Sequence, residues 1–199
     1  MRYIFLVTLF LFNVYSFAQS NDSTLRKMDV SLTYSFNSYS NLSSPNGVVY
    51  SSFQVLNTVY PFAYKSSQFG IGFGYEYVGS KDYTFKKDST LRFSEDRIPL
   101  LLSYKLGFSK TIFKYFKYQF GTALILSSNT QVKDGEQFKN LRKQIGLPIL
   151  FQMAIGIQMY DSEKLGVGLE LGYSYKQLGF KNVPEFNPNS ISFGLVAVM

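Results

Sequence analysis

The segment at residues 164–177, KLGVGLELGYSYKQ, alternates between two kinds of side chain. Every second residue is apolar or aromatic, and the residues between them are glycine, serine, Glu170 and Lys176. A period of two predicts a β-strand, because successive side chains of a strand point to opposite faces. A dry core cannot accommodate three glycines and two charges on one strand face, whereas the interior of a small membrane barrel is polar. The segment therefore favours a strand of a membrane β-barrel.

Similar alternation recurs along the chain and predicts eight strands. In strand 48–62 the pattern is mixed: Phe53, Val55 and Val59 favour one register and Leu56 and Tyr60 the other, so we expect a β-bulge there. The predicted fold is all-β, an eight-stranded antiparallel up-and-down transmembrane β-barrel, with short connections after the second, fourth and sixth strands and longer ones elsewhere. The predicted strands are Met28–Phe36 and residues 48–62, 69–78, 95–107, 117–127, 144–160, 164–177 and 190–199.

The first 18 residues have the pattern of a secretory signal peptide. A positive start at Arg2 precedes an apolar run that ends in small residues at Ala18. The run is too short for a transmembrane helix, which needs about 20 apolar residues. We expect cleavage after Ala18, which leaves residues 19–199 as a single outer-membrane barrel domain. The alternative, an amphipathic first helix, fits poorly because the segment has no polar face.

Composition agrees with an exported barrel. Phe and Tyr make up 18% of the chain, and Trp, Cys and His are absent. Without Cys, disulfides and thiolate metal sites are excluded. The formal net charge is +7, of which Arg2 carries one charge, so the mature chain remains basic. A basic exported protein suits anionic lipid head groups, and we expect no nucleic-acid partner.

Three segments, FGIGFGYEYVG, IPLLLSYKLGF and LGVGLELGYSY, together with the FAQ end of the signal segment, resemble a known family. The chain is similar to the small eight-stranded outer-membrane β-barrel proteins of Bacteroidota-type bacteria, often called PorT-like or OmpA-like barrels. The resemblance implies an outer-membrane location and assembly by the barrel-insertion machinery. It implies no single activity.

The sequence does not predict an enzyme, a cofactor or a metal site. The absence of His excludes Ser-His catalysis, His general acid–base chemistry and His metal ligands. Glu76 and Glu170 are the mid-strand acids left for a carboxylate-pair mechanism. The Gly-rich GFGYEYVG segment is predicted as a strand, so it is not a phosphate loop preceding a helix.

Six charged residues fall on the predicted inner face. Small eight-stranded barrels have interiors that side chains can fill, and buried charges there must be paired. We expect a structural ion-pair network in the lumen, with Glu76 paired to Arg97; a narrow polar pore or a gate is the alternative. The six residues are Asp29, Glu76, Arg97, Lys105, Glu170 and Lys176.

Two predicted loops, residues 79–94 and 128–143, are each net +2. Their basic residues could contact lipopolysaccharide phosphates, or they could simply be solvated. These residues are Lys81, Lys86, Lys87 and Arg92 in the first loop and Lys133, Lys139, Arg142 and Lys143 in the second.

The pattern leaves three functions open. The first is a small outer-membrane barrel with a side-chain-filled lumen and a structural or interaction role, with an envelope protein as a further partner besides lipid. The second is a narrow transport channel. The third is a soluble periplasmic lipid-binding barrel, which would require Phe69, Ile71 and Phe73 to line a cavity and the intervening glycines to face outward.

Overall fold

A computed structural model of the chain describes residues 28–36, 50–80, 83–86, 89–108, 112–134, 137–140, 147–162, 165–177 and 188–199. The predicted signal peptide at residues 1–18 lies outside these ranges. Within the described ranges, no helix has the length and apolarity needed to cross a membrane. The strands are β1 (Met28–Phe36), β2 (Tyr50–Tyr64), β3 (Ser67–Ser80), β4 (Tyr83–Lys86), β5 (Ser89–Gly107), β6 (Phe113–Asp134), β7 (Gln137–Asn140), β8 (Ile149–Asp161), β9 (Gly166–Lys176) and β10 (Asn189–Val198).

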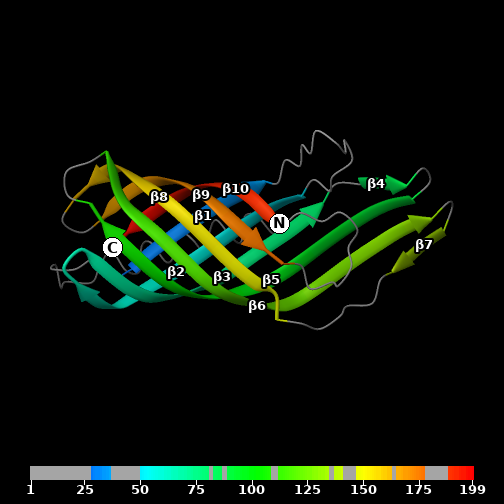
Figure 1. Ribbon diagram of the computed structural model, residues 1–199, viewed down its shortest axis with the longest axis horizontal. Coiled ribbons are helices and arrows are strands. Elements are labelled where there is room, and N and C mark those ends of the chain that lie inside the picture. Colours follow the sequence, from blue (N-terminus) through cyan, green and yellow to red (C-terminus); the bar gives the residue numbers. More distant parts are fainter. Residues whose placement is uncertain are drawn as a thin grey trace.

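Eight of these strands close into an antiparallel barrel, as predicted (Figure 1). The sheet runs in the order β4-β5-β3-β2-β1-β10-β9-β8-β6-β7, and a further pairing of β5 with β6 closes it. β1 pairs with β10, and Met28 and Met199 exchange backbone hydrogen bonds of 3.0 and 2.8 Å. Closure leaves the barrel wall without a free edge, which matters wherever water cannot satisfy backbone groups.

The connections alternate in length around the barrel. Residues 65–66, 108–112 and 162–165 join β2 to β3, β5 to β6 and β8 to β9, at the end of the barrel that also holds Met28 and Met199. We call this the turn end and the opposite one the loop end. Lys65 has a φ of 53°, the left-handed conformation used by tight hairpin turns. The predicted alternation of short and long connections is confirmed.

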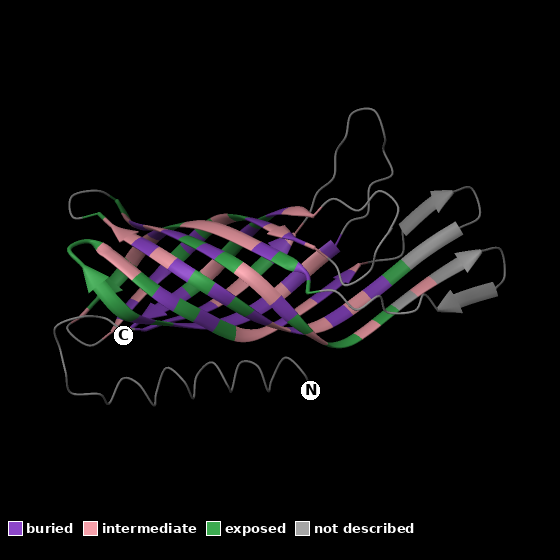
Figure 2. Ribbon diagram, turned by 60° about the horizontal axis from the view of Figure 1, so that its bottom comes forward, coloured by how far each residue is buried: buried purple, intermediate pink, exposed green. Residues whose placement is uncertain are grey.

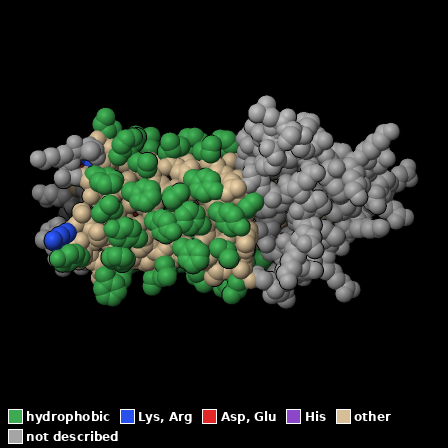
Figure 3. Space-filling model, in the orientation of Figure 1, with side chains coloured by type: hydrophobic (Ala, Val, Ile, Leu, Met, Phe, Trp, Pro, Cys, Tyr) green, Lys and Arg blue, Asp and Glu red, His purple; other side chains and the backbone are tan. Residues whose placement is uncertain are grey.

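The two faces of the strands differ sharply in burial, and Figure 2 shows the alternation along the wall. On β3, Phe69, Ile71 and Phe73 are 52%, 55% and 49% exposed, whereas Gly70 and Gly72 are buried. The third alternative, with Phe69, Ile71 and Phe73 around a cavity, is therefore wrong. On the face of the described barrel seen in Figure 3, apolar side chains predominate, and no charged side chain lies in the middle of it.

The outer face is not uniformly exposed. Val30 on β1 and its register partner Asn57 on β2 occupy outward positions but are buried, as is Val55. The exposed apolar residues come from all eight barrel strands. They include Tyr34, Phe62, Phe69, Leu102, Phe120, Ile155, Leu171 and Phe193.

The bulge predicted in the second strand is present. The register between β2 and β3 shifts between Val59 and Phe62. Leu56, before the shift, and Tyr60, within it, point inward and are buried; Phe62, after the shift, is 71% exposed. The mixed pattern therefore has two causes: a change of face at the bulge, and apolar side chains that fill the lumen.

The two charged segments predicted as loops were assigned wrongly. β3 continues to Ser80, β4 follows, and β5 begins at Ser89 instead of residue 95. Likewise β6 continues to Asp134 and β7 follows it. Hydrophobic alternation did not reveal these strands, because a sheet beyond the barrel needs no continuous apolar face. The basic residues of both segments therefore lie partly on strands.

Candidate functional site: the barrel interior

Strand alternation and register bring charged side chains into the lumen from five different strands: β1, β3, β5, β6 and β9. Glu76 on β3 lies directly opposite Arg97 on β5 in the pairing of these strands. Glu170 on β9 lies opposite Gly156 on β8 and Gly194 on β10. The glycines flanking Glu170 leave space in the lumen for its side chain and those of its partners.

One group of charges lies toward the loop end, and we call it the loop-side cluster: Glu76, Glu95, Arg97 and Lys176. Glu76 Oε2 accepts from Arg97 Nε at 2.7 Å, and Glu76 Oε1 accepts from Lys176 Nζ at 2.6 Å. The pair predicted between Glu76 and Arg97 is thus present. Both of these side chains are completely buried.

Further contacts fix the two cations of the loop-side cluster. Lys176 Nζ also donates to Ser35 Oγ at 3.1 Å and to Ser52 Oγ at 2.6 Å. Arg97 Nη1 donates to the carbonyl of Gln177 at 2.9 Å and lies 3.9 Å from Glu95 Oε2. Both cations therefore join strands on opposite sides of the lumen.

A second group, the turn-side cluster, consists of Asp29, Lys105, Lys117 and Glu170. Lys105 Nζ donates to both carboxylate oxygens of Asp29, at 2.8 and 2.9 Å. Lys117 Nζ pairs with Glu170 Oε1 at 2.5 Å. Tyr115 lies between the two ion pairs and contacts both. Its hydroxyl donates to Glu170 at 2.8 Å, and its ring centroid lies 4.3 Å from Lys105 Nζ.

An uncharged layer separates the two clusters. Gln152 Nε2 donates to Gln54 Oε1 at 3.2 Å, and Gln119 Nε2 donates to Thr58 Oγ1 at 3.3 Å. Buried Leu56, Leu101, Ala123 and Leu150 pack together in the lumen beside these amides.

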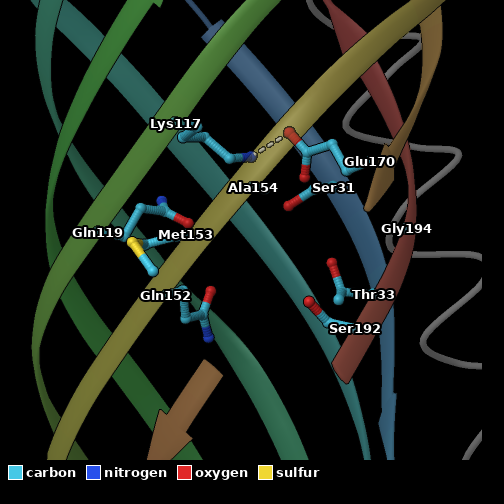
Figure 4. A pocket seen from close by; sticks show the side chains of 10 residues that line it. All are labelled: Ser31, Thr33, Lys117, Gln119, Gln152, Met153, Ala154, Glu170, Ser192 and Gly194. Atoms are coloured by element: carbon cyan, nitrogen blue, oxygen red, sulfur yellow. Dashed lines mark ion pairs between the residues drawn. The ribbon is translucent and has the colours of Figure 1, made fainter. Parts of the chain in front are cut away.

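Little space remains in this layer. A cavity of about 20 Å³ lies between the amides and the turn-side cluster. Such a volume holds about one water molecule. Figure 4 shows its lining, with the Lys117–Glu170 ion pair at one side and the amides of Gln119 and Gln152 at the other.

The buried charges of the described lumen balance. Four are acidic and four are basic, and each cluster contains two of either sign. A carboxylate or ammonium group removed from water is costly unless it is paired and hydrogen-bonded. Among the described residues, each end of the lumen is therefore neutralised separately.

All six predicted lumen residues lie inside the barrel, and they are divided between the two clusters. Sequence reasoning missed Glu95 and Lys117, which stood at the ends of predicted strands. Alternation could have found both, since Glu95 lies two residues from inward Arg97 and Lys117 two residues from inward Gln119. It could not reveal which cation meets which acid across the lumen.

The eight basic residues predicted for lipopolysaccharide contact do not form one described site. Arg92 is exposed on β5. Lys86, Lys133 and Lys139 lie on β4, β6 and β7. The remaining four, Lys81, Lys87, Arg142 and Lys143, lie outside the described residues.

The arrangement offers little for acid–base chemistry. Glu76 and Glu170, the acids considered for a carboxylate pair, lie in different clusters, and each accepts hydrogen bonds from its own cation. Among the described residues, no group of three His, Cys, Asp or Glu side chains is placed to hold a metal ion.

Comparison with protein-family models and with curated proteins finds no match for this chain. The resemblance to the PorT-like and OmpA-like barrels therefore stays a prediction from sequence pattern.

Proposed function

We propose that this chain is an outer-membrane protein of a bacterial envelope, with a barrel that spans the bilayer and a lumen closed by its own side chains. The observation that carries the proposal is the distribution of side chains across the barrel wall. Large apolar residues such as Leu102 and Leu171 are 66% and 53% exposed outside, and ions are paired inside. Water solvates such an outer wall poorly, whereas acyl chains solvate it well.

The proposed role is to support the structure of the envelope or to bind another envelope protein. The lumen is occupied by two ion clusters and an amide layer, with a cavity of about 20 Å³. A catalytic role, a cofactor and a nucleic-acid partner are not part of the proposal. Export by the N-terminal signal peptide and insertion by the barrel-assembly machinery are part of it, and outer-membrane lipid and an envelope protein are its partners.

A narrow channel is the second candidate function, because charged and polar side chains occupy both ends of the lumen and the amide layer between them. Conduction would require the layer of Gln54, Gln119 and Gln152 and both ion clusters to open. Planar-bilayer recording tests this directly. The filled-lumen proposal predicts no steady unitary conductance, and a reproducible ion-selective conductance of the purified wild-type barrel would favour the channel.

Membrane embedding is tested by partition. The full chain, including residues 1–18, is expressed in a Gram-negative host. We expect the protein in the outer-membrane fraction, extracted only by detergent, and we expect it to migrate differently on gels before and after heating. A folded monomer in the aqueous periplasmic fraction would contradict the proposal. Co-purification from native membranes in mild detergent would then identify envelope partners.

A further inference from the structure

A group of hydrogen-bond donors lies at the turn end of the barrel wall, on β2, β3 and β5. Lys65 is the first of the two residues that join β2 to β3, and it is exposed. Its Nζ lies 5.3 Å from the centroid of the Tyr64 ring. Close by, the Ser67 and Tyr104 hydroxyl oxygens are 3.2 Å apart. We call Tyr64, Lys65, Ser67 and Tyr104 the rim patch.

The rim patch belongs to the outer face of the wall. Phe69, which points outward, lies opposite Tyr104 in the pairing of β3 with β5, and the centroids of the two rings are 4.9 Å apart. Ser67 precedes Phe69 by two residues and so shares its face, and Tyr64 lies opposite Ser67. The patch therefore begins where the apolar outer face of β3, with Phe69 and Ile71, ends.

The backbone conformation of Lys65 is unusual for a lysine. Its φ is 53°, and among the described residues it is the one residue other than glycine with a positive φ. A two-residue hairpin turn favours glycine or asparagine at such a position, because a Cβ is sterically disfavoured there. The chain thus carries a basic side chain where a smaller residue would cost less, and an outlier of this kind points to a role for the side chain.

Hydrogen bonds hold this turn against the neighbouring one. Gly107 N donates to the carbonyl of Ser66 at 2.8 Å, and Phe108 N donates to the carbonyl of Lys114 at 2.7 Å. Because Gly107 and Phe108 are consecutive, the turn that carries Lys65 and the connection that leads to Lys114 lie side by side. Two basic residues therefore share this part of the turn end.

The chemistry of the rim patch fits a phosphate group attached to apolar chains. Ammonium and hydroxyl groups donate hydrogen bonds to phosphate oxygens, and aromatic residues with a polar tip are favoured at the boundary between lipid and water. Asp161, the exposed acid among the described residues of the turn end, is on β8, which pairs with none of β2, β3 and β5. Figure 3 shows basic side chains at this end, at the left margin of the apolar wall.

We propose that the rim patch binds the head group of an anionic phospholipid in the periplasmic leaflet of the outer membrane. Lys65 pairs with the phosphodiester, the Ser67–Tyr104 hydroxyl pair donates a hydrogen bond to it, and the acyl chains lie along β3 toward Ile71. Short turns of outer-membrane barrels face the periplasm. The inference rests on the proposed membrane embedding and gives the lipid partner a site.

The test measures which lipid contacts the wall next to the rim patch. One fluorophore is attached to Ile71→Cys on β3 or to Leu171→Cys on β9, both outward positions. Each labelled protein is placed in vesicles of equal parts phosphatidylcholine and phosphatidylglycerol. In one set the phosphatidylglycerol is brominated on its acyl chains, and in the other set the phosphatidylcholine is. The ratio of quenching between the two sets gives the relative affinity of the two lipids at each label.

One lysine near an anionic lipid surface corresponds to about a fivefold preference. We expect phosphatidylglycerol to be preferred about fivefold at Ile71 and less than about twofold at Leu171. Lys65→Asn is expected to remove the preference at Ile71 without lowering the stability of the barrel to urea, because Asn tolerates the left-handed conformation. The control that removes the same charge is Arg92→Asn at the loop end, where Arg92 is exposed, and it is expected to keep the preference.

An equal preference at Ile71 and Leu171 would overturn the inference. So would a preference that survives Lys65→Asn, one that Arg92→Asn removes equally, or a marked loss of stability in Lys65→Asn, which would give Lys65 a structural role instead. All of these outcomes leave membrane embedding intact, because brominated lipids still quench both labels. Absence of quenching at both labels in both sets would contradict the embedding itself, and the lipid site with it.

Discussion

Glu76 is the shared partner of two cations in the loop-side cluster. Its buried carboxylate pairs with Arg97 at 2.7 Å and with Lys176 at 2.6 Å. Replacing it by Gln leaves two cations without their shared partner. Breaking a buried ion pair from one side typically costs about 3–5 kcal/mol. We expect Glu76→Gln to lower the free energy of unfolding by about that amount, measured by urea titration in lipid vesicles with circular dichroism.

The neutral version of the cluster provides the control. Glu76→Gln combined with Glu95→Gln, Arg97→Gln and Lys176→Gln removes all four charges of the loop-side cluster, and we expect it to recover part of the loss, because no uncompensated charge remains there. If Glu76→Gln alone is as stable as the wild type, the loop-side cluster does not neutralise the lumen as described.

Gly156 positions the turn-side cluster through the ring of Tyr115. A Cβ at this position would clash with the ring of Tyr115, so Gly156→Ala must displace the ring whose hydroxyl donates to Glu170. Overpacking of this kind costs about 1–3 kcal/mol. The matched control is Gly107→Ala, whose Cβ would meet nothing closer than Ser66 O at 3.5 Å.

The same urea titration compares the two glycine variants. We expect Gly156→Ala to lower the unfolding free energy by about 1–3 kcal/mol and Gly107→Ala to change it little. Equal effects would indicate that the close approach of Tyr115 to Gly156 is not a constraint of the folded state.

At the scale of a strand, a substitution on β9 tests whether the outer face of the barrel contacts lipid. Leu171 is 53% exposed on the outer face, opposite Phe193 of β10 and Ile155 of β8. In a bilayer, Leu171→Arg is expected to cost about 2–4 kcal/mol of folding free energy, the range for a cation facing lipid near the midplane. The control is Asn129→Arg on the outer part of β6, where Asn129 is exposed beside Ser94 of β5. An equal cost at both positions would argue against lipid around β9.

The barrel strands were predictable because their two faces differ in chemistry. β1 begins and ends where the alternation predicted, and β9 and β10 differ by a residue or two. The outer parts of β5 and β6 were not predicted, nor were β4 and β7, because each has only a few alternating residues among charged ones. Their pairing depends on backbone hydrogen bonds, which leave little trace in residue type.

Candidate-site residues were predictable only in part. Alternation indicates that a charge points inward, and it identified Glu76–Arg97 because both lie on neighbouring strands. Lys105–Asp29 and Lys176–Glu76 join strands that do not pair, separated by 76 and 100 residues in sequence. Such partners depend on barrel circumference and stagger, which the periodicity of a single strand does not encode.

At the scale of the whole molecule, the central claim is that acyl chains surround the outer wall and that the lumen is sealed from them. The chain has no Cys, so a single introduced Cys can carry one fluorophore without background. Outward positions Leu102, Phe120 and Leu171 sample three strands of the wall, and exposed Arg92 samples the part of β5 that extends beyond the barrel at the loop end.

The most direct measurement is fluorescence quenching of these four single-Cys labels in vesicles made with lipids brominated on their acyl chains. The account predicts strong quenching at Leu102, Phe120 and Leu171 and little at Arg92, with the reverse order for the water-soluble quencher iodide. Strong iodide quenching and weak bromolipid quenching at all three wall positions would contradict it.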